Sequence, residues 1–207
     1  GRTDRMIAER REGPVAILTL DREDKANALT RDMLLTLSEA VTRLSAEPDV
    51  RVLILTGAGR AFSAGADLDA ARAGLATDPT WEDLSAAVAN APILTIAALN
   101  GTAAGGSLGM VLACDLRVAV PTAKLFYPVM RLGFLPQPSD AKRLAALVGP
   151  ARAKMILMAG IRMEADEARL AGLIDRIEDD ALAGALELGA AAAGASRDHV
   201  GAIKALI

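Results

Sequence analysis

Two glycine-rich stretches decide the fold: RVLILTGAGRAFSAGADL at Arg51 to Leu68, and APILTIAALNGTAAGGSLGMVLACDLRVA at Ala91 to Ala119. Each contains a short run rich in Val, Ile and Leu, which is typical of a buried strand. Each run then leads into Gly, Ala and Ser residues that favour turns. In the second stretch, Leu108 to Ala113 reads as a helix. Strands that alternate with helices predict an α/β domain.

The same alternation extends on both sides of these stretches. Val15 to Leu20 and Leu116 to Val120 are expected strands, and Thr30 to Ser45 has apolar residues at helical spacing, with Thr30 as its cap. Further helices are expected at residues 140–147, 151–159, 164–171 and 180–193. With no linker or repeat, we expect one domain over residues 1–207. Its core would span about 1–180, and 181–207 would begin a C-terminal helical region that is short or truncated.

Composition excludes several classes of function. The 207 residues carry a net charge of −3 and no basic block, which argues against a nucleic-acid partner. One cysteine rules out an internal disulfide, and a single histidine leaves no expected metal site. No apolar run is long enough to span a membrane, and the N-terminus is too charged for a signal peptide. We therefore expect a cytoplasmic protein.

Nucleotide-binding interpretations of the glycines fail on residues that the chemistry needs. After Gly57 and Gly59, the third glycine of a dinucleotide fingerprint would fall at Phe62. Gly101 to Gly106 has the spacing of a phosphate-binding loop, but Ser107 stands where the lysine is required.

A serine hydrolase is a more distant alternative. Residues 105–109 (GGSLG) fit the nucleophile-elbow pattern around Ser107, and His199 follows later in the chain, as does an aspartate at 140, 166 or 175. That elbow needs a strand running directly into the serine, whereas residues 101–106 (GTAAGG) are poor strand sequence. His199 otherwise reads as an ordinary residue on a helix face.

Both glycine-rich stretches together resemble the signatures of the crotonase (enoyl-CoA hydratase/isomerase) superfamily. The first has the turn F-x-A-G-A-D, and the second has a proline-led strand, Asn-Gly, a glycine run, a helix and Cys-Asp. Three further matches follow the family's order: KANAL at 25–29, GFLP at 133–136 followed by KRL, and ARLAGLIDRI at 168–177. The resemblance implies a crotonase/ClpP-like ββα spiral of stacked sheets surrounded by helices, in a homotrimer or hexamer.

The resemblance also implies a substrate and a site. Family members bind coenzyme A thioesters and hold the thioester oxygen with two backbone N–H groups, an arrangement that stabilises developing negative charge. Here those amides would belong to Ala64 and Gly106. CoA would be part of the substrate rather than a cofactor, and it would lie near Lys25, Ala26, Asp67 and Leu68, with Tyr127 at the acyl end. Lys25 is equally readable as a solvated lysine, Asp67 as a residue that fixes its loop, and Tyr127 as a core anchor.

The sequence departs from the family at its two catalytic glutamates. The resemblance places them at Gly109 and Val129, and neither side chain transfers protons. Relatives with other chemistry carry an acid at the position of Gln137, which cannot titrate; the nearest carboxyl is Asp140, which is either an acid/base or a helix-start residue. We therefore expect an acyl-CoA-binding isomerase or lyase rather than a standard hydratase, with a non-catalytic acyl-CoA carrier as the alternative. Cys114 reads as buried and inert.

Overall fold

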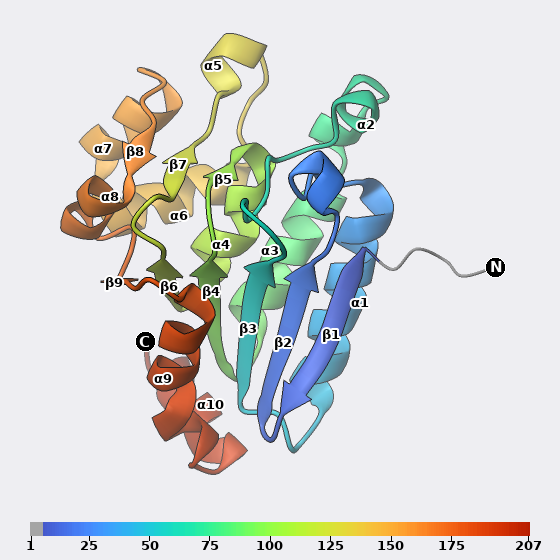
Figure 1. Cartoon of the computed structure of the whole chain (residues 1–207), viewed down its shortest axis with the longest axis vertical. Helices are drawn as coiled ribbons and strands as arrows, with labels where there is room; N and C mark the ends of the chain where they lie inside the picture. The colour runs from blue at the N-terminus through green and yellow to red at the C-terminus, as the bar shows by residue number, and fades with distance from the viewer. Residues whose placement is uncertain (1–5) are drawn as a thin grey trace.

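A computed structural model describes residues 6–207, and its centre is a six-stranded sheet (Figure 1). The strand order is β1-β2-β3-β4-β6-β9, and all neighbours are parallel except the hairpin of β1 and β2. The strands are β1 (Ile7–Glu12), β2 (Val15–Leu20), β3 (Val52–Gly57), β4 (Leu94–Leu99), β6 (Leu116–Ala119) and β9 (Arg176–Ile177).

Alternation along the strands gives this sheet two apolar faces. Leu18, Leu53 and Leu55 belong to the larger cluster, which includes helices α1 (Arg31–Ala46), α3 (Thr80–Asn90) and α4 (Leu108–Ala113). Their neighbours Ile17, Val52 and Ile54 point the other way and pack against α9 (Ala181–Ala193). Successive strand residues face opposite sides, so a continuous apolar run such as VAILTL is what a sheet covered on both faces requires.

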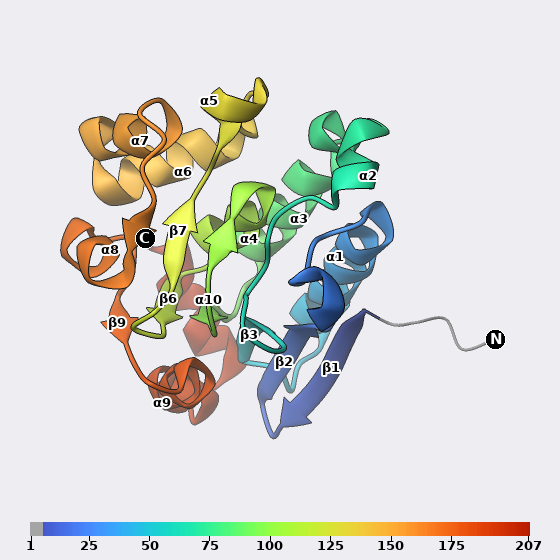
Figure 2. The ribbon, with the colours of Figure 1, turned by 45° about the horizontal axis from the view of Figure 1, so that its top comes forward.

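A smaller sheet continues the spiral beyond the carboxyl ends of β3 and β4 (Figure 2). It consists of β5 (Ala103–Ala104), β7 (Lys124–Phe126) and β8 (Met163–Glu164). The other helices are α2 (Leu68–Arg72), α5 (Val129–Leu132), α6 (Pro138–Val148), α7 (Pro150–Leu157), α8 (Ala165–Ala171) and α10 (Arg197–Ala205). Three short 3-10 turns lie at η1 (Glu23–Lys25), η2 (Leu75–Thr77) and η3 (Gly105–Ser107).

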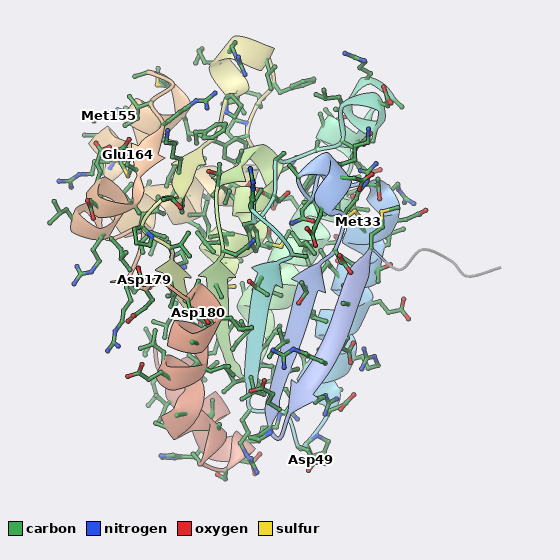
Figure 3. The ribbon with its side chains drawn as sticks, viewed as in Figure 1. Met33, Asp49, Met155, Glu164, Asp179 and Asp180 are labelled. Atoms are coloured by element: carbon green, nitrogen blue, oxygen red, sulfur yellow. The ribbon has the colours of Figure 1, made fainter. Side chains whose placement is uncertain are left out.

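The sequence predicted the strands β2, β3, β4 and β6 and most of the longer helices to within three residues, but it did not predict the short strands β5, β7, β8 and β9 or the helices α5 and α10. Thr30 caps α1 as expected, with its hydroxyl accepting from the Met33 amide at 3.2 Å. Asp180 does the same for α9 by accepting from the Ala183 amide (Figure 3). Strand β1 was missed, because its sequence IAERRE is charged and exposed beyond Ile7. Charged residues are usual on an edge strand, where they discourage pairing with other chains.

None of the helices in residues 6–207 is long and apolar enough to cross a membrane.

Candidate active site

The two glycine-rich stretches meet just beyond the carboxyl ends of β3 and β4. Ser63 and Ala103 form a parallel bridge, and the Ala104 amide donates to the Ser63 carbonyl at 3.0 Å. A Cβ at Gly101 would lie 1.8 Å from the Arg60 carbonyl oxygen, so only glycine fits there. The two signatures are therefore one backbone assembly, joined by hydrogen bonds.

The Ala64 amide is already occupied within this assembly. It donates to the Ala26 carbonyl oxygen at 2.9 Å. A donor engaged in a backbone hydrogen bond is not free to bind a substrate oxygen, since each N–H makes one strong bond. The prediction that Ala64 supplies an oxyanion-hole donor is therefore wrong.

Ala66, two residues later, has the free amide that the prediction needed. Leu29 pairs with its neighbours, donating to the Gly65 carbonyl and accepting from the Asp67 amide, so the N–H of Ala66 points away from Leu29. Within residues 6–207, the Ala66 amide donates to no protein acceptor. Gly65, at φ +99°, makes the turn that reorients the chain between Ala64 and Ala66.

The Gly106 amide is the second free donor, and it likewise has no acceptor in the described part of the chain. Gly106 is partly exposed and lies in η3, directly before α4. The Trp81 ring covers its other side, because a Cβ at Gly106 would lie 3.0 Å from that ring. The Trp81 Nε1 donates to the Leu75 carbonyl oxygen at 2.8 Å, which fixes the ring against Gly106.

The loop predicted to lie near CoA contains one residue that sequence reasoning missed. Lys25 and Ala26 are exposed, but Asn27 is completely buried. Its Nδ2 donates to the carbonyl oxygens of Ala58 and Ala61, each at 2.9 Å, and its own carbonyl accepts from the Ser63 hydroxyl. Asn27 therefore joins this loop to the first glycine-rich turn. The only indication of this role in the sequence was the position of Asn27 within the KANAL motif.

Asp67 fixes its own loop, which was the alternative to a role in binding CoA. One oxygen caps α2 by accepting from the Ala70 amide at 3.0 Å, and the other accepts from the Arg22 guanidinium at 2.9 Å. These two hydrogen bonds lower the pKa of the Asp67 carboxyl. Leu68 begins α2 and is 69% exposed.

Asp140 is the most unusual carboxyl among the described residues. It is 1% exposed in the first turn of α6, and its Oδ2 accepts from the Tyr127 hydroxyl at 2.8 Å, while Oδ1 has no protein partner. Burial raises the pKa of Asp140 to about 6, and the charge of Glu82 adds to this, whereas the Tyr127 hydrogen bond and Arg143 act in the opposite direction.

The structure bears on two predictions about this pair. Asp140 lies in the first turn of α6, as the helix-start interpretation expected, while the cap position itself belongs to Gln137. Tyr127 is 5% exposed, and its hydroxyl hydrogen is used by Asp140, so it is not free to donate to a substrate. Burial and the neighbouring carboxylate both raise the Tyr127 pKa, which keeps the phenol protonated as a donor.

Gly109 leaves the space that the free Asp140 oxygen faces. A Cβ at Gly109 would lie 2.9 Å from Asp140 Oδ1 and 2.9 Å from the Ser85 hydroxyl oxygen. Gly109 lies three residues beyond Gly106, so the free Asp140 oxygen lies beside the first turn of α4, which follows the Gly106 amide. Val129, in α5, is buried and brings no titratable group.

Helix α3 and the turn η2 hold the start of α6 in place. Glu82 Oε1 accepts from the Ser139 amide at 3.2 Å and from its hydroxyl at 2.7 Å. Gln137 Nε2 donates to the Ala76 carbonyl oxygen at 3.0 Å. These contacts fix Asp140 relative to Gly109 on α4.

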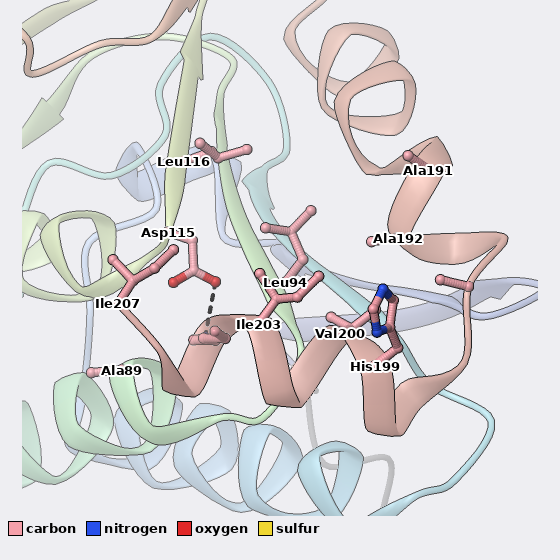
Figure 4. Close-up of a pocket in the computed structure, with 12 residues that line it drawn as sticks. Ala89, Leu94, Asp115, Leu116, Ala191, Ala192, His199, Val200, Ile203 and Ile207 are labelled. Carbon is pink, nitrogen blue, oxygen red and sulfur yellow. Dashed lines mark ion pairs between the residues drawn. The ribbon is translucent and has the colours of Figure 1, made fainter.

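The structure contradicts a serine hydrolase. Ser107 is completely buried, and its hydroxyl donates to the Ala104 carbonyl oxygen at 2.6 Å. His199 lies in α10, where it lines a hollow together with Leu94, the first residue of β4 (Figure 4). Ser107 follows the other end of β4, and a six-residue strand is about 20 Å long, so the two side chains do not meet.

This hollow measures about 730 Å³ and is mainly apolar. Its ion pair joins Asp115 to Lys204 at 2.9 Å (Figure 4). Asp115 Oδ2 also accepts from the Thr95 amide and hydroxyl, and Lys204 donates to the Ile93 carbonyl oxygen at 2.8 Å. Nearby Cys114 is buried, which raises its pKa to about 12 and agrees with an inert thiol.

Comparison with known proteins identifies the family. The profile of the enoyl-CoA hydratase/isomerase family matches residues 10–207. The chain belongs to the enoyl-CoA hydratase/isomerase family. Probable enoyl-CoA hydratase EchA14 of Mycobacterium tuberculosis is 39% identical over 197 residues, covering 92% of this chain and 77% of that protein.

Two further relatives of this family agree with the match. Crotonyl-CoA hydratase of Syntrophomonas wolfei is 35% identical over 184 residues, covering 84% of this chain and 69% of its own length. The crystal structure of an enoyl-CoA hydratase from Bacillus anthracis superposes with a TM-score of 0.90 at 33% identity, covering 96% of this chain and 80% of that one. The predicted crotonase fold is thereby confirmed.

Proposed function

We propose that this enoyl-CoA hydratase/isomerase family member binds an acyl-CoA thioester and forms its enolate. The amides of Ala66 and Gly106 would donate hydrogen bonds to the thioester oxygen, and Asp140 would remove the proton from the adjacent α-carbon. The electron pair of the broken C–H bond then moves onto the oxygen held by the two amides. Preorganised donors of this kind supply much of the rate enhancement in such reactions.

The free oxygen of Asp140 is the observation that carries this proposal. A buried carboxylate with an unpartnered oxygen destabilises a protein, so its presence needs a reason such as catalysis. With a pKa of about 6, Asp140 is mostly ionised at neutral pH and still close enough to accept a proton readily. Its position one turn from the Gly106 amide suits the α-carbon of a bound thioester.

A single proton-transfer group favours isomerase or lyase chemistry over standard hydration. Moving one proton from carbon to carbon, or removing it before a substituent leaves, needs one acid/base. The family's hydration uses two carboxylates, and Gly109 and Val129 provide neither. Those same two residues favour the second candidate function, a non-catalytic acyl-CoA carrier.

Deuterium exchange separates the two candidates without knowledge of the natural acyl group. Butyryl-CoA is incubated with the protein in heavy water, and mass spectrometry follows deuterium at the α-carbon. Enolate formation by Asp140 predicts exchange well above the rate without protein. Binding by calorimetry with no exchange would instead establish the carrier, and no binding would refute both.

A further inference from the structure

Gln137 lies between two prolines at the start of α6, and its backbone is stiff for that reason. Proline fixes its own φ, and a residue before proline is restricted to extended conformations. Gln137 accordingly has φ −57° and ψ 138°, and its carbonyl oxygen accepts from the Asp140 amide at 3.0 Å. Its own amide donates to the Tyr127 hydroxyl oxygen at 3.4 Å, and that hydroxyl donates to Asp140. Gln137 is therefore linked to the proposed base in two ways, through the helix backbone and through Tyr127.

The side chain of Gln137 extends this connection to the other side of the site. Its Nε2 donates to the carbonyl oxygen of Ala76 at 3.0 Å, in the turn η2. The preceding carbonyl, that of Leu75, accepts from the Trp81 Nε1 at 2.8 Å, and the Trp81 ring packs on Gly106. Two adjacent carbonyls of one short turn thus hold the start of α6 and the ring beside the free Gly106 amide.

The turn η2 is short, and bonds from other segments determine where it lies. It comprises three residues, follows Gly74 at φ +106°, and buries only Leu75. A 3-10 turn of this length has poor internal hydrogen-bond geometry, so contacts from outside contribute much of what fixes it. The Gln137 amide and the Trp81 indole are two such contacts, one from α6 and one from α3. A displacement of η2 would therefore disturb both.

Catalysis depends on the distance between a base and the donors that hold the oxyanion, because a misplacement of about 1 Å can slow a reaction about 100-fold. Here the two groups belong to different segments: α6 carries Asp140, and Gly106 precedes α4. We propose that Gln137 is a positioning residue, whose amide couples the start of α6 to η2 and thereby holds Asp140 at a fixed separation from the Gly106 amide. This inference rests on the proposed enolate chemistry, in which both groups act on one thioester.

The coupling can be tested without any thioester, because Trp81 is the sole tryptophan and gives one indole N–H signal in NMR. In Gln137→Met the side chain keeps its length but cannot donate to Ala76. Exchange of the indole N–H with solvent should then become about fivefold faster, as expected when a hydrogen bond that fixes η2 is lost. Gln137→Glu keeps the shape and, when ionised at pH 7, also lacks the donor, so it should show the same increase. An unchanged indole rate in both variants overturns the inference.

Ser139→Ala is the matched control, because it also removes one side-chain hydrogen bond from the start of α6. The Ser139 hydroxyl donates to Glu82 at 2.7 Å and not to η2. The indole rate of this variant should therefore stay at the wild-type value. An increase as large as that in Gln137→Met would mean that any loosening of α6 reaches Trp81, and it would overturn the assignment to Gln137.

Deuterium exchange into butyryl-CoA then tests the positioning role. Gln137→Met should lower the rate at saturating butyryl-CoA about tenfold, while the dissociation constant from calorimetry changes less than about twofold. A residue that only stabilises the fold would leave the rate per folded molecule unchanged, and that result would overturn the positioning role. If the wild type catalyses no exchange but the indole rate still rises in Gln137→Met, the proposed function is refuted and the coupling stands.

Discussion

Two aspartates lie near opposite ends of α4, and they differ in their hydrogen-bond partners. Asp115, just after the helix, accepts from the Thr95 amide, the Thr95 hydroxyl and Lys204. Asp140, beside the first turn of α4, keeps one buried oxygen without a partner. Folding normally satisfies buried polar atoms, so the unpartnered oxygen of Asp140 is the exception of the two and supports the proposed role of this end of α4.

The difference lies in where each side chain's partners come from. Asp115 is served by a strand neighbour and by α10, which its ion pair fastens to the sheet. Asp140 receives one hydrogen bond from the Tyr127 hydroxyl. Its other oxygen faces Gly109, which has no side chain.

The largest difference between the two aspartates should appear when the charge of Asp140 is removed. In Asp140→Asn, the exchange of the α-proton of butyryl-CoA should fall by about 10²–10⁴-fold, which is the usual contribution of a general base. The matched variant Asp115→Asn should exchange at the wild-type rate. Mass spectrometry measures both, and equal losses in the two variants would show that neither aspartate is the base.

The pH dependence of stability should give the next largest effect, and the raised pKa of Asp140 determines its sign. Asp140 has a folded pKa of about 6 against an ordinary 3.8, so the folded state holds the proton more tightly. Its contribution to stability is full below about pH 4 and is lost as the pH rises through 6, on the order of 3 kcal/mol in all. Asn at this position does not titrate.

The stability of Asp140→Asn relative to the wild type should therefore increase between pH 4 and pH 7, as measured by urea unfolding. The exchange rate of the wild type should rise over the same interval, because only the ionised carboxylate accepts a proton. A pH-independent difference in stability would contradict the assigned pKa.

Filling the space at Gly109 should have a smaller effect. In Gly109→Ala, the new Cβ would lie 2.9 Å from both Asp140 Oδ1 and the Ser85 hydroxyl, so these side chains must shift. We expect a loss of about 1–3 kcal/mol in unfolding free energy together with slower exchange. In Gly194→Ala, at the end of α9, the nearest atom to the Cβ is at 3.6 Å, and neither quantity should fall.

The smallest effect is expected at Asp115, the aspartate whose carboxylate has several partners. In Lys204→Met, the ion pair with Asp115 is lost, but both partners are partly exposed and Asp115 keeps its two bonds from Thr95. The unfolding free energy should fall by about 1 kcal/mol or less. The exchange rate should not change, and a large decrease would mean that α10 influences the site.

The sequence predicted the architecture because apolar runs and helical spacing are local signals. Val15–Leu20 and Leu108–Ala113 were placed at their observed bounds. The edge strand Ile7–Glu12 was not predicted, because its charged sequence gives no strand signal and it is a strand only through pairing with β2.

The site was predicted less completely, since its details depend on contacts between distant segments. The turn at Gly65 decides whether Ala64 or Ala66 presents a free amide, and no composition rule reveals that. Asp140 was singled out, but its approach to Gly109 and its bond with Tyr127 appear only once α4 and α6 are packed.

The position of Trp81 makes the protein its own optical probe. It is the sole tryptophan of the chain, so its indole emission comes from one place. That place is the face of Gly106, against which the ring packs while its nitrogen is held by Leu75. A thioester bound at the Gly106 amide, as proposed, would change the polarity and quenching around this ring, so fluorescence would count occupied sites in solution without any label.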